Sequence, residues 1–397
     1  MEPKIRFSSS NILYEEKTLS EISTINPKTN VPLEFEYVDL ESVSGTEMTN
    51  HRTEHKATAP SRAQRLAKKG DIFYQTVRPY QKNNYYFDMD DDNYVFSTGY
   101  AQIRPSIYGK YLFTLLQNDS FLKQVLDNCA GTSFPAINPS VLSRLSVRIC
   151  TDKQEQQAIA SYFTSLDSQI SASTSRLASL KQIKAASLQA MFPQEGETVP
   201  KIRFKGFEGE WTWLKLGDIS EQVKRKAPIN STAPVMMISA LNGFINQSEK
   251  YSDNNAGSSL ANYTLLKKGE LSYNHGYSKT RNFGSCFNLL VEEARIPFVY
   301  HSFRLTNDND SFYAYYLNSG TKDKDLKRLV SSTARMDGLL NISFKNYMEL
   351  SVPHPSLAEQ QAIANYFTSL DRQISLQSQR LEKLKQIKSA CLDKMFV

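Results

Sequence analysis

The sequence lacks the features that mark several large classes of protein. No run of about 18 apolar residues occurs in its 397 residues, which excludes a transmembrane helix. The four cysteines are scattered without a Cys-x-x-Cys spacing, so we expect ordinary thiols of a cytoplasmic protein. Residues 1–7 lack the apolar stretch of a signal peptide, and this also favours the cytoplasm.

Neither sign of charge dominates the chain. It has 47 Lys and Arg residues against 41 Asp and Glu residues, a formal net charge of +6. This excess is too small for a uniformly basic protein, so any contact with nucleic acid must come from a local cluster of cations. Apolar residues make up 40% and charged residues 22%, a composition that excludes a disordered chain.

Catalytic and metal-binding motifs are missing as well. The sequence contains no glycine-rich dinucleotide motif, no P-loop and no His-Glu-x-x-His, and its five histidines have no spacing for a metal site. Residues 138–141 are similar to the Asn-Pro-Pro-aromatic motif of adenine methyltransferases. They lack the second proline and the aromatic residue, so we interpret them as structural. The chain is therefore expected to bind without catalysing a reaction and to hold no metal or cofactor of its own.

A long internal repeat is the most prominent feature that the sequence does have. Glu-Gln-Gln-Ala-Ile-Ala at 155–160 recurs at 359–364, and the offset of 204 residues holds without a gap to Met-Phe at 191–192 and 395–396. A shorter repeat, Lys-Ile-Arg-Phe, stands at residues 4–7 and 201–204. The sequences between these repeats differ, so the chain alternates variable regions with one repeated element.

The longer repeat is predicted to be a helix. Pro and Gly are absent from 151–192, and Pro193 ends the first copy. Apolar residues step by four and three, as in a coiled coil. These residues are Ile159, Phe163, Leu166 and Ile170 in the first copy, and Ile363, Phe367, Leu370 and Ile374 in the second. Polar Ser173 and Gln377 interrupt this pattern at equivalent places. We expect the two helices to pair with each other; the alternative is that each packs only on its own domain.

Helix ends and length follow from the same segments. A capping box is predicted at Ser356 with Glu359 and, in the first copy, at Thr151 with Gln154 or Asp152 with Glu155. About 35 helical residues at a rise of 1.5 Å span roughly 50 Å. Paired antiparallel, two such helices would act as a rigid spacer between two globular regions.

The predicted fold class is mixed α/β (α+β), with two globular domains separated by two long antiparallel coiled-coil helices in a tandem repeat. We place the globular domains at 1–150 and 193–354, and the helices at 151–192 and 355–397. Within the globular regions, strands are expected at 69–74, 145–149, 268–273 and 350–352, and helices at 113–126 and 312–317.

Cations cluster in the first variable region between residues 51 and 82, where only Glu54 and Asp71 oppose them. Carboxylates gather instead at 88–92, and this separation favours a basic face that contacts phosphates. A solvated loop is the alternative. The candidate phosphate contacts are Arg52, Arg62, Arg65 and Lys69, with Lys224 and Arg225 as weaker counterparts in the second region.

Two polar stretches with interleaved aromatic residues, 75–86 and 274–282, follow the predicted strands. Arg and Lys can read guanine edges, and Asn and Gln can read adenine edges. The candidates for base contact are Arg78, Tyr80, Lys82 and Asn83 in the first stretch, and Asn274, His275, Tyr277, Lys279 and Arg281 in the second. The loops before the long helices add Thr132 and Arg335. An ordinary surface loop is the alternative for each.

Two dissimilar regions, each followed by a Glu-Gln-Gln-x-Ile-Ala-x-Tyr-Phe helix, resemble the specificity subunit of type I restriction–modification systems. Residues 201–211, from Lys-Ile-Arg-Phe to Trp211, are similar to the family's start of the second domain, whereas the segment at 4–7 lacks the Gly-Phe and Trp that follow. The resemblance implies two target-recognition domains, each reading one half of a split, asymmetric double-stranded DNA site, with no catalysis by this chain.

The resemblance also implies partners. Two modification subunits would carry S-adenosylmethionine, and restriction subunits would carry ATP with magnesium. The helix residues that match the family's repeats would serve spacing and docking of the modification subunits. Two alternatives stay open: a structural coiled-coil adaptor that does not contact DNA, and a fused methyltransferase or nuclease.

Overall fold

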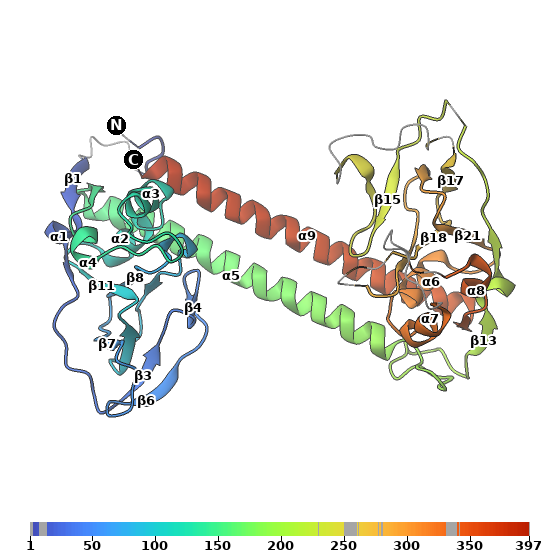
Figure 1. Cartoon of the computed structure of the whole chain (residues 1–397), viewed down its shortest axis with the longest axis horizontal. Coiled ribbons are helices and arrows are strands. Elements are labelled where there is room, and N and C mark those ends of the chain that lie inside the picture. The colour runs from blue at the N-terminus through green and yellow to red at the C-terminus, as the bar shows by residue number, and fades with distance from the viewer. Residues whose placement is uncertain are drawn as a thin grey trace. The chain divides into compact units, whose positions relative to one another are not determined.

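The structure, a computed structural model, describes residues 3–7, 14–228, 230–249, 260, 262–276, 278, 281–330, 340 and 342–396. The chain divides into unit 1, Met1–Thr174 with Gln379–Val397, and unit 2, Ser175–Ser378. Two long helices, α5 (Lys153–Ala190) and α9 (Leu357–Met395), each begin in one unit and end in the other (Figure 1). Each unit therefore contains half of both helices together with one globular region. We call residues 14–150 the first head and 212–354 the second head.

The first head is built on two four-stranded sheets. One has the strand order β2-β11-β8-β9 and is antiparallel throughout; the other has the order β6-β3-β10-β7, in which only β10 and β3 run parallel. The strands are β1 (Tyr14–Thr18), β2 (Ser23–Ile25), β3 (Glu34–Val38), β4 (Val43–Ser44), β5 (Glu47–Met48), β6 (Arg52–His55), β7 (Ala63–Leu66), β8 (Ile72–Gln75), β9 (Tyr85–Tyr86), β10 (Tyr94–Ser97), β11 (Tyr100–Pro105) and β12 (Ser146–Cys150). The helices are α1 (Leu19–Ile22), η1 (Pro79–Gln81), α2 (Gly109–Leu115), α3 (Asp119–Asp127) and α4 (Pro139–Leu142).

The second head repeats part of this plan. The sheet β14-β21-β18-β19 corresponds to β2-β11-β8-β9, and the pair β13–β22 corresponds to β1–β12. The strands are β13 (Thr212–Lys215), β14 (Ser220–Gln222), β15 (Met236–Ser239), β16 (Gly243–Asn246), β17 (Thr264–Lys267), β18 (Leu271–Asn274), β19 (Ser285–Asn288), β20 (Glu293–Ile296), β21 (His301–Leu305) and β22 (Ser351–His354). The helices are η2 (Leu216–Ile219), η3 (Gln247–Glu249), α6 (Asp310–Leu317), α7 (Asp323–Leu329) and α8 (Phe344–Met348). The heads differ beyond the shared sheet, where the second has the separate pairs β15–β16 and β17–β20.

Strand β8 shows how the sequence directs packing in the first head. All four of its residues are buried. Because side chains alternate along a strand, Ile72 and Tyr74 join the apolar cluster that includes the long helices. Phe73 points to the other side, where its ring stacks on Phe96 with centroids 3.6 Å apart. The strand thus lies between two cores.

The long helices pack against each other within each unit, as predicted, and the alternative that each packs only on its own domain is wrong. In unit 1, Tyr162 Oη lies 3.5 Å from Cys391 Sγ, and Lys388 Nζ lies 2.5 Å from Asp167 Oδ1. Residue numbers rise along α5 while they fall along α9, so the pair is antiparallel. The seam residues Ile159, Phe163 and Leu166 are buried, and Ile170 is half-buried.

Unit 2 contains the repeat-related contacts. Ser187 Oγ lies 2.9 Å from Tyr366 Oη, and Lys184 Nζ lies 2.5 Å from Asp371 Oδ1. These residues stand 204 positions from their counterparts in unit 1. Their seam residues behave alike: Ile363, Phe367 and Leu370 are buried, and Ile374 is half-buried. The same packing is therefore used twice.

The helix caps differ from the prediction in one respect. In α5, Asp152 Oδ1 accepts hydrogen bonds from the backbone N–H groups of Gln154 and Glu155, at 2.7 and 3.0 Å. In α9, Ser356 Oγ accepts from the N–H of Glu359 at 3.4 Å. The carboxylate of Glu359 binds a distant arginine and tryptophan instead of completing a capping box, so that half of the prediction is wrong.

The helix predicted at 113–126 is two helices, α2 and α3. Asn118 separates them because its side chain accepts a hydrogen bond from Ser120 N at 2.6 Å and caps α3. Its amide also donates to the backbone carbonyl of Leu392 at 2.8 Å, near the end of α9.

Among the residues that the structure describes, none of the helices is apolar and long enough to cross a membrane.

Candidate nucleic-acid interface

The repeated Glu-Gln-Gln motif fixes the first head to α5. Gln156 Nε2 donates to the carbonyl of Cys150 at 2.7 Å, and its Oε1 accepts from the N–H of Tyr108 at 3.3 Å. Glu155 is only 3% exposed, and its Oε1 accepts from the N–H of Phe7 at 3.1 Å. One short motif thus orients both the head and the N-terminal arm on the helix.

The second copy makes corresponding contacts. Gln360 Oε1 accepts from the N–H of Asn309 at 2.9 Å. Glu359 is 1% exposed, and both of its oxygens are bound by the guanidinium of Arg203, at 2.7 and 2.8 Å. Trp211 Nε1 donates to the same carboxylate at 3.1 Å. The residues that carry the sequence repeat are therefore the ones that position the heads.

Each Met-Phe end of a long helix is buried in a head core. In unit 1, the Phe396 ring lies 6.1 Å from Phe163 and 5.7 Å from Tyr111, measured between centroids. In unit 2, Phe192 stacks on Phe367 at 5.9 Å. A head therefore packs against the beginning of one long helix and the end of the other.

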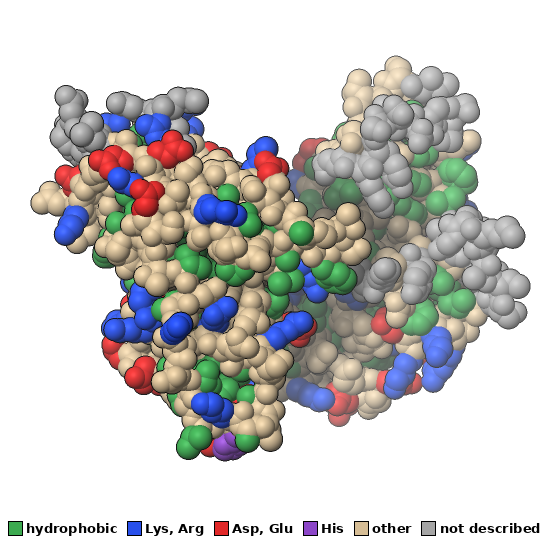
Figure 2. Space-filling model, turned by 60° about the vertical axis from the view of Figure 1, so that its left-hand side comes forward, with side chains coloured by type: hydrophobic (Ala, Val, Ile, Leu, Met, Phe, Trp, Pro, Cys, Tyr) green, Lys and Arg blue, Asp and Glu red, His purple; other side chains and the backbone are tan. Residues whose placement is uncertain are grey.

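The cation cluster of the first head is less separated from carboxylates than its sequence predicts. Arg52 binds Asp39 and Glu54, each at 2.8 Å. Lys69 Nζ lies 2.6 Å from Asp90 Oδ1, so the acidic stretch folds back on the basic one and the predicted separation is wrong there. In the part of Figure 2 that lies forward, Lys and Arg side chains stand in small groups with carboxylates beside several of them.

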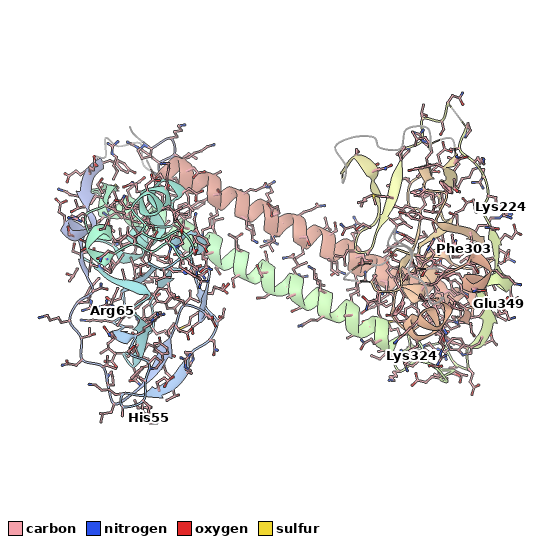
Figure 3. The ribbon with its side chains drawn as sticks, in the orientation of Figure 1. His55, Arg65, Lys224, Phe303, Lys324 and Glu349 are labelled. Carbon is pink, nitrogen blue, oxygen red and sulfur yellow. The ribbon has the colours of Figure 1, made fainter. Side chains whose placement is uncertain are left out.

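Two arginines of this cluster, Arg62 and Arg65, form no ion pair with the described residues but differ in burial. Arg62 is exposed and makes no ion pair with any residue that the structure describes. Arg65 lies on β7 and is half-buried (Figure 3), and burial lowers the pKa of its guanidinium. Among the three arginines of 51–69, Arg62 is thus the one best placed for a phosphate.

The structure brings together two loops that the sequence proposed separately. The N–H of Arg78 donates to the carbonyl of Pro135 at 2.8 Å, and Val77 and Ala136 form an isolated β-bridge. The guanidinium of Arg78 lies over the ring of Phe134, 4.8 Å from its centroid.

These joined loops also present exposed side chains. Phe134 is 62% exposed and Tyr80 is 50% exposed. Thr132, two residues before Phe134, is exposed as well. The sequence predicted this loop, 131–134, as a candidate and chose Thr132 from it as a site residue, but not Phe134. The signal that could have found Phe134 is an apolar ring in a loop that begins with a glycine.

Lys82 and Asn83 have intramolecular partners. The ammonium of Lys82 binds the carboxylate of Asp119, and Asn83 Oδ1 accepts from the N–H of Gly45 at 2.9 Å. These contacts tie the loop to α3 and to the β4–β5 hairpin. Their part in DNA binding stays a prediction, and the ammonium of Lys82 and the amide oxygen of Asn83 already have partners.

In the second head, Arg225 binds both carboxylate oxygens of Glu270, at 2.9 and 3.2 Å. Lys224 beside it is exposed (Figure 3) and forms no ion pair with the described residues. Asn274 Oδ1 accepts from the N–H of Gly276 at 3.0 Å, which holds the turn after β18. Of the two cations, Arg225 and Lys224, only Lys224 forms no ion pair with the described residues.

His275 and Arg281 are withdrawn from the surface to different degrees. His275 is buried, with its ring nitrogens 2.7 Å from the Leu340 carbonyl and 2.9 Å from the Val299 carbonyl, so it supports a loop rather than offering an edge to DNA. Burial lowers the pKa of the Arg281 guanidinium, and the charge of Asp323 opposes this. The candidates Tyr277, Lys279 and Arg335 lie outside the described residues.

No group of three or more His, Cys, Asp or Glu side chains in the described part of the chain could hold a metal ion. Residues 138–141 have the structural role predicted for them: Asn138 caps α4 by accepting a hydrogen bond from Ser140 N at 2.9 Å.

Comparison with known sequences finds the same family by a family model and by a relative. The family described as "Type I restriction modification DNA specificity domain" matches the chain twice, at residues 11–182 and 208–386. The type I restriction enzyme HindI specificity subunit of Haemophilus influenzae is 35% identical over 139 residues, which are 34% of this chain and 30% of that relative. The alignment therefore spans less than a third of the relative's length.

Two solved structures share the fold. The S subunit of a type I restriction–modification system from M. genitalium has a TM-score of 0.64 at 16% identity, over 100% of this chain and 99% of its own. A chain from a study of complex assembly and conformational transition of the type I R-M system has a TM-score of 0.53 at 18% identity, over 96% and 97%. The first of these matches extends along the whole chain, long helices included, and the second along nearly all of it.

Proposed function

Because this chain belongs to the family of type I restriction–modification DNA specificity domains, we propose that it selects the DNA site of such a system. Each head binds one half of a bipartite, asymmetric double-stranded site. The observation that carries this proposal is the double family match, one copy on each head and the helix that follows it. Two dissimilar heads on one repeated anchor suit two dissimilar half-sites.

The long helices set the separation of the half-sites in this proposal. The ion pairs Asp167–Lys388 and Lys184–Asp371 are related by the repeat and fix the same antiparallel register in both units. A register fixed twice gives a spacer of defined length, and about 1.5 Å of length follows from each helical residue.

Partners supply the chemistry. Two modification subunits carrying S-adenosylmethionine dock on the two equivalent repeats, since a duplicated surface offers two equivalent places. Restriction subunits carry ATP with magnesium. This chain supplies recognition without catalysis.

The test is to express the chain with its modification subunit in a host that lacks adenine methylation, and to map methylated adenines by long-read sequencing. We expect one motif with two constant halves and a fixed gap, which disappears without this chain. Methylation that is the same with and without the chain would support an adaptor that does not contact DNA. Methylation by the purified chain alone with S-adenosylmethionine would support a fused enzyme.

A further inference from the structure

Arg78, which is half-buried, and Phe134, which is exposed, form a cation–aromatic pair where two loops of the first head meet. The guanidinium carbon lies 4.8 Å from the ring centroid, and the ring is 62% exposed. Arg78 makes no ion pair with any described residue, unlike Arg52, Lys69 and Lys82. A charge and an apolar ring are thus held together at the surface without an evident structural partner.

The backbone under Arg78 is held in an uncommon conformation. Its φ and ψ are both 54°, in the left-handed region, and Lys82 also has a positive φ of 55°. These two residues flank the 3-10 turn Pro79–Gln81. One end of the turn is fixed by the hydrogen bond from Arg78 N to Pro135 O, and the other by the Lys82–Asp119 ion pair. Strained backbone that the surroundings hold in place is typical of functional sites.

The backbone of the loop that carries Phe134 is also held in one conformation. Ala130 and Ala136 pair as a β-bridge across it, and Gly131 has a φ of +89°. A Cβ at this glycine would lie 3.3 Å from the carbonyl oxygen of Phe134, so another residue would strain the loop. The ring is therefore placed by the fold.

Stacking on a ring uses the face of a guanidinium and leaves its in-plane N–H groups available. Two parallel N–H groups match the O6 and N7 acceptors of guanine in the major groove, the commonest specific contact to DNA. A guanidinium whose position is already restricted by a neighbouring ring loses less entropy when it makes this contact. Lysine, a point charge on a flexible stem, could not use the same arrangement.

We propose that Arg78 reads a guanine in the half-site bound by the first head, and that Phe134 is the positioning residue that holds its guanidinium. This inference rests on the proposed function of the chain. Within residues 75–86 it assigns the guanine to Arg78 rather than to Lys82, because Lys82 is paired with Asp119.

The experiment uses the complex with the modification subunit and a duplex containing the mapped site. Each guanine of the half-site assigned to the first head is replaced in turn by 7-deazaguanine, which lacks the N7 acceptor. We expect one replacement to weaken binding by about fivefold or more. In the Arg78→Ala and Arg78→Lys complexes, the same replacement should have no effect, and the genomic motif should lose its guanine at that position.

Phe134 is tested by its own series. Phe134→Ala should partly relax the same position, and Phe134→Trp, which keeps a stacking face, should restore it. Phe298→Ala is the matched control, since that ring is also largely exposed, at 58%, but lies in the second head and has no cation over it among the described residues. This control should leave the first half-site unchanged.

Several outcomes would overturn the inference while the proposed function stands. One is a wild-type complex with a bipartite motif whose first half contains no G·C pair. Another is a 7-deazaguanine penalty of equal size with and without Arg78. If the Arg78 variants do not fold, the 7-deazaguanine replacements with the wild-type complex still test the proposal. If none of these replacements weakens binding, the proposal is wrong. A wild-type complex with no sequence preference would instead refute the proposed function itself.

Discussion

Glu359 is a carboxylate that folding removes almost completely from water. Burial of a charge is costly unless hydrogen bonds and an opposite charge replace the lost hydration. Arg203 binds both oxygens, and Trp211 donates to one of them. Glu359 in turn raises the pKa of the Arg203 guanidinium. The linker between the repeats is thereby attached to the beginning of α9.

Removing Arg203 should therefore be far more costly than removing a surface cation. Arg203→Ala leaves the buried Glu359 carboxylate without its opposite charge, with only the Trp211 hydrogen bond remaining. The expected loss of unfolding free energy is about 3–5 kcal/mol. Lys215→Ala is the control, because its ion pair with Glu349 is solvent-exposed and should contribute little. Urea unfolding followed by circular dichroism measures both. Equal effects of the two variants would contradict the assigned role of Glu359.

His301 makes the stability of the second head depend on pH. Burial lowers the pKa of its ring, and the neighbouring His275, stacked at 4.8 Å, lowers it further, although the Ile342 carbonyl opposes this. The unfolded chain therefore binds a proton more readily than the folded one. Stability from the neutral ring is complete above the ordinary pKa of 6.5 and is lost as pH falls below it. We expect Tm to fall between pH 7.5 and 5.5, and to fall less in His301→Gln. An equal fall in the variant would refute this.

Arg62 and Lys69 should differ in how they contribute to DNA binding. Each phosphate contact that is lost lowers the slope of log affinity against log salt by about 0.9. The Arg62 side chain forms no ion pair with the described residues, whereas Lys69 is paired with Asp90. Arg62→Ala should therefore flatten the salt dependence for matched and unmatched duplexes alike, and Lys69→Ala should change it less. Titrations at several salt concentrations measure the slope, and an unaltered slope in Arg62→Ala would place that residue away from DNA.

At the scale of the single residue, the sequence indicated which loops matter but not which side chains are available. Arg78, Lys82 and His275 are all polar residues that follow a predicted strand. Arg78 lies over an exposed ring, Lys82 is tied to α3, and His275 is buried. These fates depend on partners such as Asp119 and Leu340, which are distant in sequence. Local pattern carries no information about such partners.

The elements themselves were more predictable where the repeat is strong. Both long helices and their pairing follow from two nearly identical apolar patterns. The short strands are harder to predict from the sequence. In the first head, β3, β6, β7 and β10 form a sheet that no sequence signal indicated. Their order, with β10 between β3 and β7, brings together segments that are far apart in the chain. Pairing of this kind is set by packing rather than by local periodicity.

A helix insertion tests the spacer at the scale of the element. Asp167 to Lys184 on α5 and Asp371 to Lys388 on α9 span equal numbers of residues between the two ion pairs. Four residues must therefore be inserted in both helices, after Ser173 and after Gln377, to keep both pairs. The gap of the methylated motif should grow by about 6 Å, or two base pairs. An insertion in α5 alone should destabilise the chain, and an unchanged gap after the double insertion would refute the spacer role.

For the whole chain, the compact units cut both long helices near Ser173 and Gln377, whereas the sequence suggested limits where the helices begin and end. The physical reason is the Met-Phe end of each helix. Phe396 and Phe192 are buried in head cores, so each half-helix packs as part of a unit. The sequence shows where the repeated helix begins and ends. The two packing units instead meet within each helix, so the two kinds of boundary differ.

Head exchange should change one half-site only, provided that the anchors are kept. The first head can be replaced over 14–150 by another head of the family, with the arm at 4–7 and both helices retained. Long-read methylation mapping should then show a new first half-site, an unchanged second half-site and an unchanged gap. The donor must supply an aromatic residue in place of Tyr111, because that ring lies 5.7 Å from Phe396 and is fully buried. The same chimera with alanine at this place is the control, and its first half-site should be lost through a loosened head. A change in both halves would show that the heads do not read independently.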